Sequence, residues 1–122
     1  MDSEDLLVSA ALLGRGQDSA DLVAGLADRL ERALPRRVTV DRHGWGKGRK
    51  VKSLTVELDQ ETFRLQVDRR EVSCWIDQIV REIRLRSEQI DMEGWLERLA
   101  VGLSREAKKS VENRLAIEDA LR

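Results

Sequence analysis

The sequence predicts a two-layer α+β fold in which an N-terminal and a C-terminal helix cover one face of a four-stranded antiparallel meander sheet. Two observations lead to this prediction. Near both ends of the chain, apolar residues recur every three or four positions, whereas for roughly forty residues between them apolar and polar residues alternate. The first period is typical of amphipathic helices and the second of strands with one buried face. Short connections between consecutive strands favour antiparallel neighbours.

Length and composition indicate a single domain over residues 1–122. A chain of 122 residues with 41% hydrophobic content suffices for one core, and a second core would lack apolar material. Its 22 basic and 23 acidic residues nearly cancel, which argues against a global electrostatic attraction to nucleic acid or anionic membranes. No apolar run approaches the ~20 residues of a membrane span, the start of the chain is acidic, and a lone cysteine is typical of a reducing compartment. We therefore expect a cytoplasmic protein without a membrane span.

Two helices are expected before the sheet. Residues 1–17 predict a short N-terminal helix that frays readily, because Gly14 and Gly16 stop it. Asp18 is the expected N-cap of the second helix, whose apolar stripe recurs at three- and four-residue spacing and faces the core. Pro35 is expected to end this helix.

Four strands follow in the predicted meander. The alternating stretches are 38–41, 53–58, 62–68 and 72–77. Turns are expected near Asp59 and near Arg69. Residues 76–86 fit either a helical stripe or a strand. We favour a strand that continues past a bulge near Gln78 to Val80, where the alternation slips by one residue.

A long C-terminal helix is predicted to begin after an N-cap at Asp91. Its first half carries the apolar residues Met92, Trp95, Leu96, Leu99 and Leu103 at helical spacing. Beyond Ser104 only one apolar residue per turn remains, including Val111 and Leu115, among many charges. We therefore expect the end of this helix, residues 104–122, to project from the domain and to suit a partner helix.

Trp75 is a large apolar residue on the predicted polar face of the sheet. Exposed aromatic residues are often interface hot spots, so Trp75, together with Arg64, is a candidate interface residue of a homodimer. The alternative is that the ring packs against the side chain of Arg64 or Arg86 on neighbouring strands, which leaves this face solvated. The sequence leaves both open.

A basic loop rich in glycine lies over residues 42–52. Its candidate binding residues are Arg42, His43, Trp45, Lys47, Arg49, Lys50 and Lys52. Cations neutralise phosphates and an indole can stack on a base, so contact with nucleic acid is chemically reasonable. We favour a solvated hairpin loop instead, because a lone basic loop is not specific. A phosphate-binding P-loop is excluded, because no Gly-Lys-Ser/Thr sequence follows to open a helix.

The sequence predicts no catalytic residues, no metal site and no cofactor. His43 is the only histidine, which leaves transition metals and a Ser-His-Asp triad without support. Cys74 is expected to point into the core, where a thiol is inert. The many carboxylates are expected to be solvated turn charges.

The C-terminal helix start, Asp91-Met92-Glu93-Gly94-Trp95-Leu96, resembles that of a group of small α+β proteins from high-GC Gram-positive bacteria, and the order of elements over residues 18–121 is similar to theirs. The resemblance implies the fold and no activity. The layout of helix, strands and helix is also loosely similar to that of YbaB-type nucleoid proteins, which are small DNA-binding dimers, although their sequence pattern is missing.

We therefore expect a non-catalytic protein-interaction or assembly module that self-associates, as a homodimer, through Trp75 or the C-terminal helix. The alternative is a nucleic-acid-binding protein that uses the loop over residues 42–52.

Overall fold

Two helices and one antiparallel sheet form the part of the chain that this computed structural model describes, residues 19–44 and 50–121. The elements in chain order are α2 (Ser19–Ala33), β1 (Val38–His43), β2 (Lys50–Glu57), β3 (Glu61–Asp68), β4 (Glu71–Val80), β5 (Ile83–Ile90) and α3 (Met92–Ala120). The class is α+β, as predicted. The helix expected within residues 1–17 and the cap at Asp18 lie outside the described residues.

The sheet has five strands in the order β1-β2-β3-β4-β5, so the predicted number of four strands is wrong. The additional strand arises because the chain turns at Arg81 and Glu82, which join β4 to β5. Both residues have positive φ angles, 51° and 68°. Gly, Asn and Asp are the usual residues in such turns, so an Arg-Glu pair gave no turn signal in the sequence.

The predicted bulge near Gln78 coincides with a register shift between β4 and β5, but the extra residue lies in β5 and not in β4. Gln78 pairs with Arg86, whereas the next residue, Ile79, pairs with Arg84. One residue of β5, Leu85, is thereby left without a partner in β4, which is the arrangement of a β-bulge. The strand nevertheless ends at Val80 and does not continue toward residue 86.

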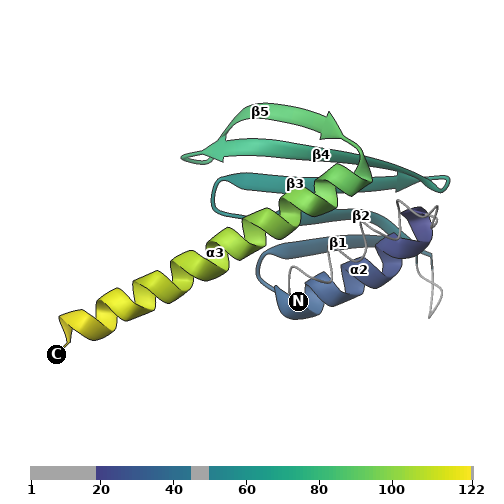
Figure 1. Cartoon of the computed structure of the whole chain (residues 1–122). Coiled ribbons are helices and arrows are strands. Elements are labelled where there is room, and N and C mark those ends of the chain that lie inside the picture. Colours follow the sequence, from purple (N-terminus) through teal and green to yellow (C-terminus); the bar gives the residue numbers. More distant parts are fainter. Residues whose placement is uncertain (1–18, 45–49, 122) are drawn as a thin grey trace.

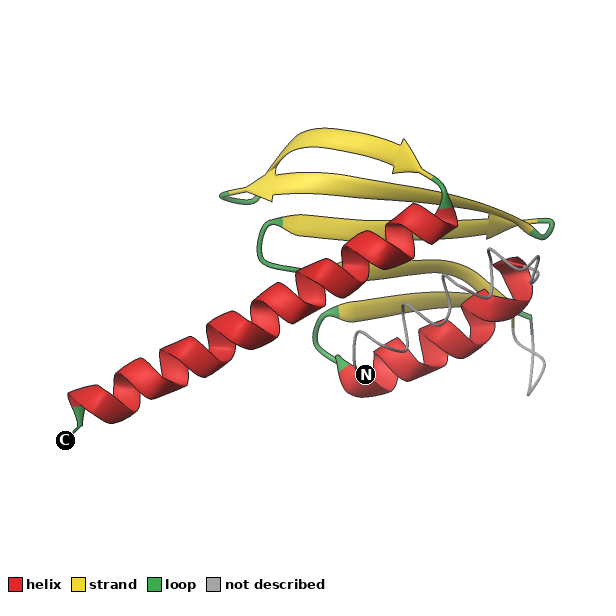
Figure 2. Ribbon diagram, in the orientation of Figure 1, coloured by secondary structure: helices red, strands yellow, loops and turns green. Residues whose placement is uncertain are grey.

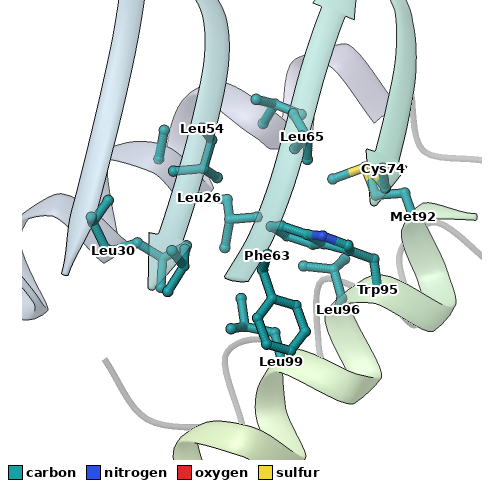
Figure 3. Close-up of a cluster of buried hydrophobic side chains, with 14 of the residues drawn as sticks. Leu26, Leu30, Leu54, Phe63, Leu65, Cys74, Met92, Trp95, Leu96 and Leu99 are labelled. Atoms are coloured by element: carbon teal, nitrogen blue, oxygen red, sulfur yellow. The ribbon is translucent and has the colours of Figure 1, made fainter. Parts of the chain in front are cut away.

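Both helices lie on the same face of the sheet, and no described element covers the other face (Figures 1 and 2). The core between the layers is apolar, and its largest fully buried side chains include Leu26, Leu30, Leu54, Phe63, Leu65, Trp95, Leu96 and Leu99 (Figure 3). The Trp95 ring meets the Phe63 ring edge-on, with centroids 5.9 Å apart. Its indole N–H donates a hydrogen bond to the carbonyl oxygen of Trp75, 3.1 Å away. Burial of the indole therefore leaves no unpaired donor.

Helix α3 begins as predicted, because the Asp91 carboxylate accepts a hydrogen bond of 2.8 Å from the backbone N–H of Gly94. The buried residues of α3 end at Gly102. Beyond that point the helix extends past the strands into open space (Figure 1). In the described part of the chain, neither helix has the length and apolar character needed to cross a membrane.

Candidate functional site

The distal segment of α3, residues 104–121, is the largest part of the described chain that makes little contact with the rest. Apart from the half-buried Glu106, all of its residues are exposed. Val111 and Leu115 remain 46% and 52% exposed, and Ile117 and Leu121 are exposed further along. A helix normally gains its stability by packing one face. This segment therefore offers a preformed helical surface with apolar side chains on which no described residue is packed.

Glu106 fixes the point at which the distal segment leaves the sheet. Its carboxylate accepts a hydrogen bond of 3.0 Å from the Arg37 guanidinium, just before β1. It also accepts one of 2.8 Å from the backbone N–H of Asp59, between β2 and β3. One turn earlier, a Cβ on Gly102 would lie 2.8 Å from a methyl group of Leu58, so glycine allows close approach there. The direction in which the segment projects is thus set by specific contacts.

The tip of the β4–β5 hairpin is a second exposed apolar region. Ile83 and Leu85 are each 63% exposed, and Val80 is also exposed. β5 is an edge strand, so one side of its backbone has no strand partner among the described residues. Exposed edges of this kind can pair with another chain. The sequence reasoning missed this surface because it did not recognise β5 as a separate strand.

Trp75 lies on the open face of the sheet and is half-buried. Its cross-strand neighbour is Arg64, whose guanidinium carbon lies 5.2 Å from the centre of the indole ring. The same guanidinium donates to both carboxylate oxygens of Asp77, at 2.6 and 3.2 Å. This geometry corresponds to the alternative in which an arginine covers the ring, and it reduces the apolar surface that Trp75 can offer. Trp75 and Arg64 as interface residues stay a prediction.

Among the described residues, Asp77 is the one charged side chain that is buried, with 4% exposure. Burial by itself would raise the pKa of Asp77, but hydrogen bonds from Arg64 and Ser87 and the nearby charges of Arg64 and Arg84 outweigh it, so the pKa lies below its ordinary value of 3.8. The Ser87 hydroxyl donates over 2.6 Å. This carboxylate is therefore held ionised by structural partners and is unsuited to accept a proton as a general base near neutral pH.

The candidate residues of the basic loop are placed only in part. Trp45, Lys47 and Arg49 lie outside the described residues. Arg42 turns back to α2, where its guanidinium donates to both carboxylate oxygens of Glu31, each at 3.3 Å. The remaining three line a common cavity with a neighbouring turn. Its lining residues are His43, Lys50, Lys52, Arg69 and Arg70, together with Asp68 and the apolar Val23, Ala24, Val51 and Val67. This cavity measures about 740 Å³ as bounded by the described residues.

Groups that could carry chemistry are few in the described part of the chain. There, no three His, Cys, Asp or Glu side chains come close enough to hold a metal ion. Burial, and to a smaller extent the charge of Asp91, raises the pKa of the Cys74 thiol to about 12. A thiol in that state is a weak nucleophile at neutral pH.

No family model, no curated protein and no solved structure matches this chain. The resemblance noted at the start of α3 stays a prediction.

Proposed function

We propose that this chain is a non-catalytic protein-interaction module and that the distal segment of α3 is the element that it offers to a partner helix. The single observation that carries the proposal is the exposed helix over residues 104–121, with Val111 and Leu115 in the middle of it. A helix-in-groove or helix-to-helix contact would bury these side chains at the spacing of one turn.

The proposal requires the distal segment to be dispensable for folding. All buried apolar residues of α3 lie before Leu103, so a chain that ends after Ser104 keeps the core. We expect this shortened chain to unfold cooperatively, with the near-ultraviolet circular dichroism of the buried Trp95 preserved. Loss of the folded state on truncation would assign the segment a structural role and would contradict the proposal.

The proposal also requires the apolar side chains of the segment, Val111 and Leu115, to be uncovered in the free protein and covered on binding. In dilute full-length protein, we expect the backbone amides of residues 106–121 to exchange with solvent much faster than those of the sheet, because local opening costs little there. They should become protected when the protein associates. Strong protection of these amides in the dilute monomer would contradict the proposal.

A second candidate function, binding of nucleic acid, is supported by the basic lining of the cavity beside the β1–β2 loop. Lys50 and Lys52 come from β2, and Arg69 and Arg70 come from the turn before β4, so separate segments place cations around one cavity. Such a cluster can neutralise phosphates.

This second function predicts binding of a mixed-sequence DNA duplex or a single-stranded RNA that weakens steeply with salt. Fluorescence anisotropy of labelled nucleic acid measures it. Lys50→Ala with Lys52→Ala should weaken binding, whereas Lys108→Ala with Lys109→Ala, which removes the same charge from α3, should not. Equal losses from both pairs would point to nonspecific attraction.

A further inference from the structure

A regular stripe runs along one side of the second half of α3. Its residues alternate at spacings of three and four: Val101, Ser104, Lys108, Val111, Leu115 and Glu118. This is the spacing of the a and d positions of a coiled coil, and three of the six residues, Val101, Val111 and Leu115, are apolar as those positions require. Val101 is exposed although its neighbours Ala100 and Gly102 are buried, so the stripe points away from the sheet.

The charges of the distal segment are polarised along the helix. Three basic residues, Arg105, Lys108 and Lys109, lie in its first half, and two acidic residues, Glu118 and Asp119, lie near its end. Three residues depart from this pattern, Glu106, Glu112 and Arg114. Glu106 is already held by Arg37 and the backbone of Asp59. The surface that faces outward is therefore basic near the sheet and acidic far from it.

The stripe is self-complementary about Asn113. If two copies of α3 cross antiparallel at Asn113, residues equidistant from it face each other. Val111 then faces Leu115 of the second copy, and Lys108 faces Glu118 of the second copy. In a parallel pair, each lysine would face a lysine and each glutamate a glutamate, which is destabilising.

The length of the distal segment fits the same arrangement. Leu121, the C-cap of α3, lies eight residues after Asn113, and Arg105 lies eight residues before it. The end of one helix therefore falls opposite the place where the other leaves its sheet. The overlap from Arg105 to Leu121 extends over about 25 Å at 1.5 Å per residue, and the two sheets lie at opposite ends. An interface of this size is small, so we expect dissociation constants of roughly 10 to 1,000 µM.

We infer that the partner of the distal segment is a second copy of this chain, bound antiparallel across a two-fold axis near Asn113, with Val111 against Leu115 and Lys108 against Glu118. This inference rests on the proposed function, since it names the occupant of the same surface. In this arrangement the charges of Lys108 and Glu118 select both the partner and the antiparallel direction of the two helices.

Charge reversal in the full-length chain tests the inference. By symmetry, Lys108→Glu places two pairs of like charges in the dimer, and so does Glu118→Lys. Each single variant should weaken dimerisation by about tenfold or more, measured by sedimentation over the concentration range given above. The double variant, Lys108→Glu with Glu118→Lys, should restore it. In a parallel dimer the double variant would gain nothing.

Disulfide trapping gives an independent measure of direction. Under mild oxidation, Val111→Cys mixed with Leu115→Cys should form a cross-linked dimer, and neither variant should do so alone. A parallel pair would give the opposite result, because each cysteine would face its own copy. Native Cys74 is buried and its thiol pKa is about 12, so it does not compete.

The outcomes separate this inference from the proposed function. Self-association that needs the distal segment but ignores the charge reversals would overturn the antiparallel pairing and leave the interaction module standing. A full-length chain that stays monomeric at 1 mM would overturn the second copy as partner, while amide exchange still tests whether the segment is an unpaired docking helix. Self-association that survives removal of the segment would overturn the second copy as its occupant and would make the edge of β5 the next surface to test.

Discussion

Arg64 contacts both an apolar ring and a buried carboxylate on the open sheet face, Trp75 and Asp77, each of which would be unfavourable without a partner. Its guanidinium lies over the Trp75 ring and at the same time forms a bidentate pair with Asp77. Part of the tryptophan ring is covered and the buried carboxylate is paired, so one side chain on β3 interacts with two on β4. In the described structure, no buried side-chain polar atom lacks a hydrogen-bond partner.

The pairing of Asp77 predicts a loss of stability in acid. The pKa of Asp77 is lower in the folded chain than its ordinary value of 3.8, so below that pH the unfolded chain binds more protons and the free energy of unfolding falls as pH falls. Asp77→Asn should lower stability at pH 7 by roughly 1–3 kcal/mol and flatten this acid dependence. Urea unfolding between pH 7 and pH 2 measures it.

Ser87→Ala is the graded control for this prediction. It removes the 2.6 Å hydrogen bond to Asp77 and leaves the Arg64 pair in place. We expect a smaller loss at pH 7 than for Asp77→Asn. If Asp77→Asn unfolds with the same acid dependence as the native chain, another group is responsible.

Cys74 provides a second prediction at the scale of one residue. It is buried on β4 with a thiol pKa of about 12, so the native protein should react with iodoacetamide at pH 8 at least about a hundredfold more slowly than the unfolded chain. Mass spectrometry of samples quenched over time gives both rates. Equal rates would place the thiol at an accessible surface.

Two hairpin turns hold non-glycine residues in the left-handed region. Arg69 and Arg70 join β3 to β4, and Arg81 and Glu82 join β4 to β5, all with φ between 49° and 72°. Each such residue lowers the free energy of unfolding by roughly 1–2 kcal/mol relative to a glycine at the same position, because a Cβ atom disfavours this conformation. The sheet holds these turns in place because the strands on either side are paired along their length.

Replacing the second turn by Asn-Gly should therefore stabilise the fold. We expect Arg81→Asn with Glu82→Gly to raise the free energy of unfolding by about 1 kcal/mol or more, measured by denaturant unfolding, because this pair prefers the left-handed region. Arg81→Gln with Glu82→Gln removes the same charges without this preference and should give no gain. A gain from both pairs would mean that charge, and not the backbone, limits stability.

At the scale of the whole molecule, we expect the two described tryptophans to contribute very differently to the free energy of unfolding. Trp95 is fully buried between α3 and the sheet, whereas Trp75 is half-buried on the open face. Trp95→Ala should cost about 3–5 kcal/mol because it leaves a large cavity in the core. Trp75→Ala should cost about 1 kcal/mol.

Thermal or chemical unfolding of the two variants compares these values. A loss at Trp75 as large as the loss at Trp95 would mean that the open face is packed against a second chain under the conditions used. The pair of variants thus also reports on whether an interface forms through the sheet.

Periodicity alone determined most of the architecture. Alternation identified β1 to β4 and helical spacing identified the buried face of α3, because burial of one face imposes these patterns on local sequence. Asp91 marked the start of α3, because its side chain can cap the first turn. Val111 and Leu115 were found in the same way, since a core-facing stripe that thins toward the end of a helix signals exposure.

Tertiary structure decided the rest. The fifth strand depends on the turn at Arg81 and Glu82, whose conformation is imposed by the pairing of β4 with β5. Neither residue type prefers this conformation, so the local sequence does not predict the turn. The partners of Trp75 depend on strand register, which places Arg64 opposite it. The direction of the distal segment depends on Glu106 meeting Arg37 and Asp59, residues distant in sequence, and such contacts exist only once the sheet has formed.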